Sequence, residues 1–311
     1  MTRPTIGSVT RSFQLLAVVL LAAALAACGG AEGTQVTAGE PISFEQLSQA
    51  AQTSADATSG RFSFGFEVSS PELEHELGLS GEGAFDAASG RAAFSADMSS
   101  FMTLLGGLFA GIGGGDGPDL GDPALWTIET VRDGSTTYVK VPALADELPD
   151  GKSWVKAEDG QAVEAGSFKL REFEQFTQAD PKQFLETLEE LSGEIEVVGT
   201  ETLRGVETTH YRATVDAESV AASASNESGQ DLGGLTDQFV GQSGISEVPI
   251  DIWIDGEGVV RKVLLDVEAT PPGDSAPSHA MVSFELWDFG QPVEIELPPA
   301  SEVVDASDLK R

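Results

Sequence analysis

The hydrophobic residues of this chain follow two different periods, which separate predicted helices from predicted strands. Between residues 42 and 55 the apolar side chains recur every three or four positions, and this spacing predicts a short amphipathic helix. From Phe62 onward they alternate with polar residues, as in a strand that is buried on one face. Segments with this alternation or a short apolar run are 62–68, 77–85, 92–98, 125–131, 136–141, 153–156, 194–198, 206–215, 250–254, 263–267 and 282–286.

Turn-forming residues separate several of these predicted strands. Ser89-Gly90 follows the second strand, and Asp133-Gly134 is a strong signal for a tight hairpin. Asp255-Gly256 begins another turn. These turns join strands that are neighbours in sequence, so the pattern predicts antiparallel pairing.

Two segments interrupt the strands. Pro181 and the spaced apolar residues after it predict a helix over 181–191. The segment 216–247 is rich in Ser, Ala and Gly, so we expect its middle to be mobile, with short helices at 219–223 and 235–240. No alternation of strand and helix typical of a parallel sheet is present.

The pattern therefore predicts an α+β fold with about 10–11 strands in a largely antiparallel sheet. Each strand has one apolar face that must be buried. Either the sheet curls toward a barrel or helices cover it. The pattern alone leaves both arrangements open.

The segment 101–112 differs from the rest of the chain because it is apolar on all sides and rich in glycine. It is too short to span a bilayer. Three interpretations remain open. The segment is a buried helix or loop that plugs the mouth of the sheet, a pliable apolar lid over a lipid-sized cavity, or a patch that dips into the bilayer.

The first 28 residues have the layout of a bacterial lipoprotein signal. Arg3 and Arg11 are basic, residues 15–27 are apolar, and the sequence LAAC ends at Cys28. A transmembrane helix is the alternative, but about 13 apolar residues fall short of the roughly 20 that span a bilayer. We expect a lipidated Cys28 that anchors the chain outside the cytoplasm. The expected organisation is a signal peptide at 1–27, a flexible tether at 28–41, one domain at 42–298 and a polar tail at 299–311.

Charge and cysteine content exclude several classes of function. The full chain has a net charge of −34, and removal of residues 1–27 takes away two arginines and no acidic residue. Such a charge disfavours nucleic acid and anionic headgroups, so membrane attachment must rest on the acyl anchor. Cys28 is the only cysteine, which excludes a disulfide framework, a zinc–thiolate cluster and a cysteine nucleophile.

Several motifs together resemble the LppX/LprAFG-type lipoproteins of actinobacteria, within the LolA/LolB-like superfamily of lipoprotein carriers. The resemblance covers most of residues 40–298. Its motifs are the lipobox at Cys28, TYVKVP at 137–142, SWV at 153–155, VGTE at 198–201, RGVETTHY at 204–211, and VPIDIWID at 248–255 with Gly258.

The resemblance implies an open half-barrel, a curved antiparallel sheet with helices over its concave face around an apolar cavity. It also implies a lipid or an acylated glycolipid as the ligand, with a membrane transporter as a candidate partner. The alternating strands and the apolar segment supply the expected cavity lining, which is Phe62, Phe64, Phe66, Phe94, Phe101, Leu104, Leu105, Leu108, Phe109, Ile252 and Val263.

Catalytic and metal-binding motifs fail on their spacing, so we expect no enzyme, no cofactor and no metal. His75-Glu76 begins like the zinc motif HExxH, but Leu79 takes the second ligand position. His210 lies in the alternation opposite the face of Tyr211, and we expect a surface or partly buried strand histidine there. Two acidic groups considered for calcium lack EF-hand spacing, namely Asp116, Asp119 and Asp122, and Asp251, Asp255 and Glu257.

Two hypotheses of function follow. In the first, the domain binds or shuttles a lipid in its cavity without any covalent step, and segment 101–112 gates entry. In the second, the same fold fills its cavity with its own side chains and presents a surface to a protein partner in the envelope. A continuous apolar cavity favours the first hypothesis, and a close-packed interior favours the second.

Overall fold

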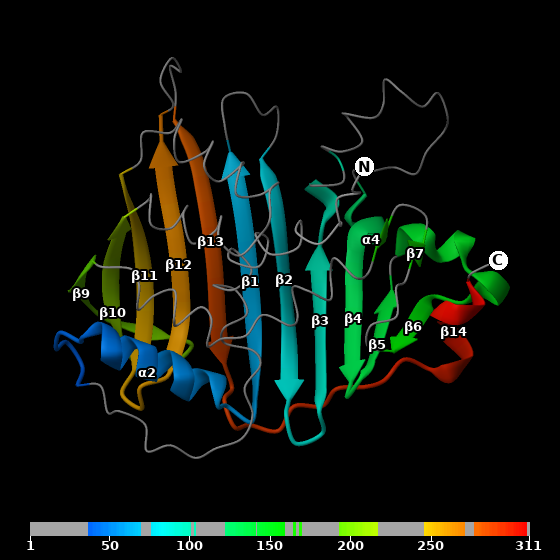
Figure 1. Ribbon diagram of the computed structural model, residues 1–311, viewed down its shortest axis with the longest axis horizontal. Helices are drawn as coiled ribbons and strands as arrows, with labels where there is room; N and C mark the ends of the chain where they lie inside the picture. The colour runs from blue at the N-terminus through cyan, green and yellow to red at the C-terminus, as the bar shows by residue number, and fades with distance from the viewer. Residues whose placement is uncertain are drawn as a thin grey trace, which may run out of the picture. The chain divides into compact units, whose positions relative to one another are not determined.

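Helices and short helical turns are few in the part of the chain that the computed structural model describes, and strands dominate (Figure 1). That part comprises residues 37–69, 76–100, 103, 122–140, 142–158, 164–165, 168–169, 193–216, 246–270 and 277–309. Its strands are β1 (Ser59–Ser69), β2 (Leu77–Asp86), β3 (Arg91–Asp97), β4 (Thr127–Asp133), β5 (Thr136–Lys140), β6 (Trp154–Glu158), β7 (Glu164–Ala165), β8 (Phe168–Lys169), β9 (Gly193–Leu203), β10 (Val206–Asp216), β11 (Glu247–Asp255), β12 (Val260–Ala269), β13 (Ser278–Trp287) and β14 (Val303–Asp305). Its helices and 3-10 turns are α2 (Phe44–Ala55), α4 (Pro123–Trp126), η1 (Pro142–Glu147), η2 (Pro149–Gly151), η4 (Ala300–Glu302) and η5 (Ala306–Asp308).

The main sheet is open and mostly antiparallel, and it contains twelve strands, while β7 and β8 pair separately. This is one strand more than the upper expectation from the sequence. The additional strand is β14, which has only three residues and pairs parallel to β6. Three residues are too few to show an alternating pattern, so the hydrophobic pattern did not predict this strand.

The chain divides into two compact units, each made of two stretches of sequence. The first unit comprises Met1–Ala57 and Glu174–Leu286, and the second comprises Thr58–Phe173 and Trp287–Arg311. We describe each unit by itself.

In the first unit the strand order is β13-β12-β11-β10-β9, with antiparallel pairs throughout. The alternating isoleucines of β11 share one face, and Ile252 lies opposite Tyr211 on β10 and Val263 on β12. Helix α2 covers this face with Leu47 and Ala50. The result is a closely packed core in which Tyr211 has no exposed surface.

Helix α2 begins at a capping box. The Ser43 hydroxyl accepts a hydrogen bond from the Gln46 backbone N–H at 3.2 Å, and the Ser43 N–H donates to Gln46 Oε1 at 2.9 Å. These bonds satisfy two backbone donors that a helix start would leave unpaired. Near the other end, the buried Ser54 hydroxyl accepts from the N–H of Val260 at 2.8 Å. Both ends of α2 are thus fixed, and the second one is fixed directly to β12.

In the second unit the strand order is β14-β6-β5-β4-β3-β2-β1. The hairpins predicted at Ser89-Gly90 and Asp133-Gly134 are confirmed, and both glycines have positive φ angles, 68° and 59°. Residues 299–309 differ from the expected polar tail. Val304 pairs with Val155, and Val304 and Ala306 are buried, so this segment contributes to the core of the unit.

Some predictions fall outside the described residues. These are the helix at 181–191, the short helices at 219–223 and 235–240, and the apolar segment 101–112 apart from Thr103. The helix predicted at 42–55 is confirmed, and it begins at Phe44. The first residues of the segment 125–131 are helical rather than extended, because Asp122 caps α4 and Pro123 occupies its first turn.

Candidate functional site

The phenylalanines of β1 and β3 gather on one face of the second unit. Phe62, Phe64 and Phe66 alternate along β1, and register through β2 places Phe94 of β3 on the same face as Phe62. All four side chains are half-buried. We call these four residues the phenylalanine face.

Glycines of β2 make room for two of these rings. Gly83 lies directly opposite Phe62, and a Cβ atom there would come within 2.4 Å of the Phe62 ring. A Cβ atom at Gly81 would come within 2.6 Å of the Phe64 ring and 2.4 Å of the Ser95 carbonyl oxygen. Any larger residue at either position would displace a ring or the neighbouring strand. Because these positions are glycines, the two rings can lie over β2 and form an apolar surface there.

The phenylalanine face continues into a filled part of the same unit. One cross-strand row runs from Phe94 to Thr130 on β4, Val139 on β5 and Val155 on β6. Val139 and Val155 are buried in a cluster with Ile128, which also contacts residues of η1. This face is thus close-packed over β4 to β6, and on β1 and β3 its four phenylalanines are half-buried beside the buried Ala96.

Two other residues of the expected cavity lie in the first unit. Ile252 is buried within the core that α2 closes, and Val263 packs against that core while partly buried. The structure therefore brings Phe62, Phe64, Phe66 and Phe94 together on one face and places Ile252 beside Val263 in another unit. Cys28, Phe101, Leu104, Leu105, Leu108 and Phe109 lie outside the described residues.

A polar cluster occupies the opposite face of the first unit. His210 is buried, and its Nδ1 lies 3.1 Å from Glu201 Oε1 while its Nε2 lies 2.7 Å from Asp251 Oδ1. The ring stacks on Trp253 with a centroid distance of 4.1 Å, and the Trp253 indole N–H donates to Glu201 Oε2 at 3.0 Å. The Lys262 ammonium lies 4.7 Å from the centre of the Trp253 ring. His210 thus lies on the face opposite Tyr211, as expected, but it is buried rather than at the surface, and its partners are on two strands, β9 and β11.

Asp251 is the charged centre of this cluster. Arg212 donates to both of its oxygens at 2.9 Å, and Arg212 and His210 share Oδ1. Burial alone would raise the pKa of Asp251, but the hydrogen bonds from Arg212 and His210 outweigh it and lower the pKa below its ordinary value. The same bond with Asp251 raises the pKa of Arg212. Asp251 is therefore ionised and hydrogen-bonded to Arg212 and His210, as in a structural ion pair.

Of the acidic residues considered for calcium, Asp116 and Asp119 lie outside the described residues, while Asp255, like Asp251, is engaged in structure. Asp255 Oδ1 accepts from the N–H groups of Glu257 and Val259 at 2.9 Å, and Arg261 Nε donates to Oδ2 at 2.7 Å. These bonds close the predicted turn. Among the described residues, no group of three or more His, Cys, Asp or Glu side chains is arranged to hold a metal ion.

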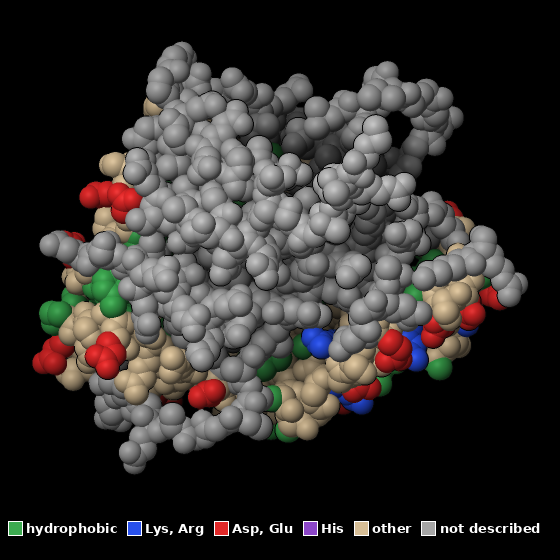
Figure 2. All heavy atoms as spheres, viewed as in Figure 1, with side chains coloured by type: hydrophobic (Ala, Val, Ile, Leu, Met, Phe, Trp, Pro, Cys, Tyr) green, Lys and Arg blue, Asp and Glu red, His purple; other side chains and the backbone are tan. Residues whose placement is uncertain are grey.

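Acidic side chains are prominent on the described surface, with basic side chains beside some of them (Figure 2). In the second unit Lys140 pairs with Glu129 at 2.7 Å, and Lys156 pairs with Glu158 at 3.1 Å. Exposed pairs of this kind contribute little stability. They are typical of a solvated acidic surface, which is the ordinary explanation of the negative charge.

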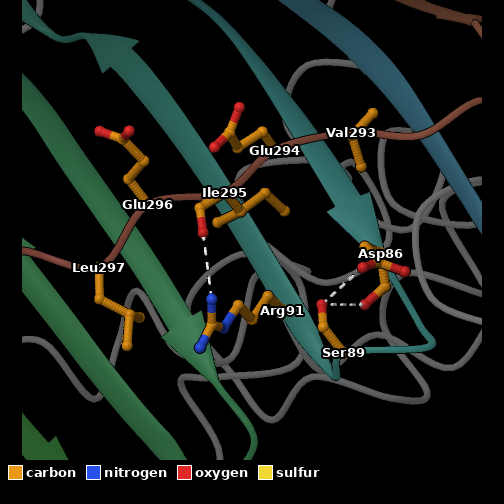
Figure 3. A pocket seen from close by; sticks show the side chains of 8 residues that line it. All are labelled: Asp86, Ser89, Arg91, Val293, Glu294, Ile295, Glu296 and Leu297. Atoms are coloured by element: carbon orange, nitrogen blue, oxygen red, sulfur yellow. Dashed lines mark hydrogen bonds between the residues drawn. The ribbon is translucent and has the colours of Figure 1, made fainter.

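A pocket of about 380 Å³ lies in the second unit, between the β2–β3 turn and the extended segment 293–297 (Figure 3). Arg91 donates to the Ile295 carbonyl oxygen at 3.4 Å and pairs with Asp133 at 3.1 Å. The hydroxyl of Ser89 donates to Asp86 at 2.7 Å and lowers the pKa of that carboxylate. Asp86, Arg91, Glu294 and Glu296 give the pocket a charged lining, so it lacks the character of the expected apolar cavity.

Sequence reasoning missed several structural partners. It did not find Glu201, which belongs to the VGTE motif but reaches His210 and Trp253 only through strand register. It also missed the glycines under the rings, although Gly81 and Gly83 alternate along a strand in which glycine is otherwise unfavourable.

No helix among the described residues is both long enough and apolar enough to cross a membrane.

Comparison with known proteins gives one relative by sequence and several by structure. No protein-family model matches the chain. An uncharacterized 31.2 kDa protein of Streptomyces griseus, from the rplA–rplJ intergenic region, is 28% identical over 160 residues. The match covers 51% of this chain and 50% of that protein, so the chain spans about half the length of this curated relative.

The solved structures that match include two mycobacterial lipoproteins. LppX of Mycobacterium tuberculosis is 14% identical, with 81% of this chain and 97% of LppX covered and a TM-score of 0.40. LprF of Mycobacterium bovis is 14% identical, with 84% and 99% covered and a TM-score of 0.43. A putative outer membrane lipoprotein-sorting protein domain of Vibrio parahaemolyticus is 7% identical, with 81% and 93% covered and a TM-score of 0.23. These are similarities in structure at low sequence identity, and they name the kind of protein that the sequence pattern also resembles.

Proposed function

We propose that this protein is an extracytoplasmic lipoprotein, anchored by lipidated Cys28, that binds or shuttles a lipid without enzymatic chemistry. The observation that carries the proposal is the phenylalanine face. Four phenylalanines on one side of β1 and β3 are only half-buried, although other apolar faces of both units are close-packed. An acyl chain that covers an apolar surface of this kind lowers the free energy of the system, because apolar area is removed from water.

Burial energies indicate how long that chain must be. Each buried methylene contributes about 0.8 kcal/mol, so ten methylenes contribute about 8 kcal/mol and four contribute about 3 kcal/mol. Association costs about 4 kcal/mol or more in lost freedom of motion. A short acyl chain therefore does not offset the cost, and the proposed ligand is a long-chain lipid or an acylated glycolipid.

The proposal retains the half-barrel and the gate expected from the sequence. The sheet would curve around the ligand with helices over its concave face, and the apolar segment 101–112 would control entry. The acyl anchor on Cys28 would keep the acidic domain at the membrane, where a transporter is a candidate partner. The net charge of −34 supports this role for the anchor, because the protein body has little attraction to anionic lipid.

A second candidate function rests on the packing of the first unit. There Tyr211 and Ile254 have no exposed surface and α2 fills the face of the sheet. If the phenylalanine face is filled in the same way, the protein would act as an interaction module of the envelope. That outcome corresponds to the second hypothesis from the sequence.

Extraction of the purified protein tests the proposal. The protein is incubated with membranes, re-purified, and extracted with organic solvent for mass spectrometry. We expect lipid with long acyl chains in a fixed ratio to protein. A protein that yields no lipid above the level of an unrelated acidic protein carried through the same steps would contradict lipid binding and favour the interaction module.

A further inference from the structure

Two buried side-chain groups of the second unit have no hydrogen-bond partner in the described part of the chain. They are the Thr130 hydroxyl and the Trp126 indole N–H. Thr130 is 4% exposed and Trp126 is 9% exposed. In native structures most buried polar groups are bonded, because a buried donor without a partner costs the free energy of its lost hydration.

Thr130 lies at the junction between the half-buried and the filled parts of its sheet face. It is directly opposite Phe94 on one side and Val139 on the other, so all three residues share that face. Neighbouring side chains on opposed strands lie within contact distance. The hydroxyl therefore adjoins the phenylalanine face at its inner end.

Trp126 belongs to the same region. It ends α4 and directly precedes β4, and its carbonyl oxygen accepts a hydrogen bond from the Met98 N–H at 3.1 Å. Met98 packs against the cluster around Ile128, and Ile128 lies on the same face of β4 as Thr130. Two unpartnered donors thus lie near one apolar surface, within five residues of the chain.

We propose that Trp126 and Thr130 bind the carbonyl oxygens of a neutral acyl ester or amide whose chain covers the phenylalanine face. This inference rests on the proposed function and names the chemistry of its ligand. An indole N–H only donates, so its partner must be an acceptor. An ionised fatty acid is a poorer partner, because a buried unpaired charge is costly and the row from Phe94 through Val139 to Val155 offers it no cation. Arg132 shares this face of β4, but its Nε–H donates to the Gly134 carbonyl oxygen at 2.9 Å.

The test compares two ligands that differ only in the acceptor. Methyl palmitate carries an ester, and nonadecane has the same number of heavy atoms without one. Each displaces the dye Nile red from the purified full-length protein. The variants are Thr130→Val and Trp126→Phe, with Thr200→Val and Trp154→Phe as controls. Thr200 is exposed on β9, and Trp154 lies on the opposite face of the second unit.

We expect the wild-type protein to bind the ester at least about tenfold more tightly than the alkane. In each test variant this ratio of affinities should fall about tenfold. Alkane binding should not change. The ligand-free Thr130→Val protein should unfold at the same temperature as wild type or higher, because the variant removes an unsatisfied hydroxyl. The controls should keep the preference for the ester.

Other outcomes overturn one claim or both. If the wild-type protein binds both ligands equally, or if both test variants keep the preference, the inference is wrong while the proposed function stands. If Thr130→Val lowers the unfolding temperature and leaves the preference intact, the partner of the hydroxyl is a buried water and the inference is wrong. If the wild-type protein binds neither ligand, the proposed function fails and the inference fails with it.

Discussion

At Asp251 a single buried carboxylate receives hydrogen bonds from Arg212 and His210. His210 and Asp251 belong to the two sequence motifs of β10 and β11 that carry the resemblance to known lipoproteins, and Arg212 directly follows the first motif. Their contacts join β10 to β11, and Glu201 extends them to β9. At the scale of single residues, the motifs therefore specify how strands are fixed to one another, and no reacting group is needed to explain them.

Replacement of Asp251 by Asn should lower the free energy of unfolding by about 1–3 kcal/mol at neutral pH, because it weakens charge-assisted bonds to Arg212 and His210. The pKa of Asp251 is lowered in the folded protein. Its stabilising contribution is therefore complete above the ordinary value of about 4 and is lost as the pH falls below it. Denaturant unfolding of both proteins from pH 7 to pH 3 measures the difference.

The matched control is Asp266→Asn, which removes a more exposed carboxylate that lies 2.6 Å from His279. It should change stability by less than about 1 kcal/mol. A difference between wild type and Asp251→Asn that stays constant down to pH 3 would show that the carboxylate is not held as described.

Helix α2 shows how one element closes the core of the first unit. Its apolar positions pack on the isoleucines of β11, and its capping box defines where it begins. The sequence predicted this helix from its spacing, and the strands of β11 and β12 from their alternation. It did not predict which strands the helix covers, because that depends on pairings between segments far apart in the chain.

Truncation of Leu47 to Ala should destabilise the protein by about 2–5 kcal/mol, because Leu47 is 3% exposed and its loss leaves a cavity beneath α2. Gln52→Ala is the control on the exposed side of the same helix and should change stability by less than about 0.5 kcal/mol. Thermal or denaturant unfolding checks both. Equal effects of the two substitutions would mean that α2 does not pack on the sheet as seen.

Other features could not be predicted from the local hydrophobic pattern. β14 is parallel and three residues long, and Pro298 and Pro299 before it suggested that the ordered domain had ended. The apolar alternation of β1 did place its phenylalanines on one face, as the structure confirms. Whether that face is filled depends on tertiary packing, which a two-residue period does not encode.

For the whole molecule, acidic charge, a single cysteine and an apolar sheet face form one consistent account. The charge keeps the body away from anionic surfaces, and the expected anchor on Cys28 would hold it near lipid. The charge follows directly from the sequence, and the anchor on Cys28 stays a prediction from it. The unpartnered donors of Trp126 and Thr130 could not be inferred from the sequence, because a group is known to lack a partner only once its neighbours are known.

The most direct test of lipid binding at the phenylalanine face is photo-crosslinking with a long-chain lipid that carries a diazirine on its acyl chain. Peptide mass spectrometry then locates the adducts. We predict saturable adducts on β1, β2 and β3, reduced by an excess of unlabelled lipid. Adducts that do not saturate, or that fall mainly on the polar cluster around His210 and Trp253, would contradict the account.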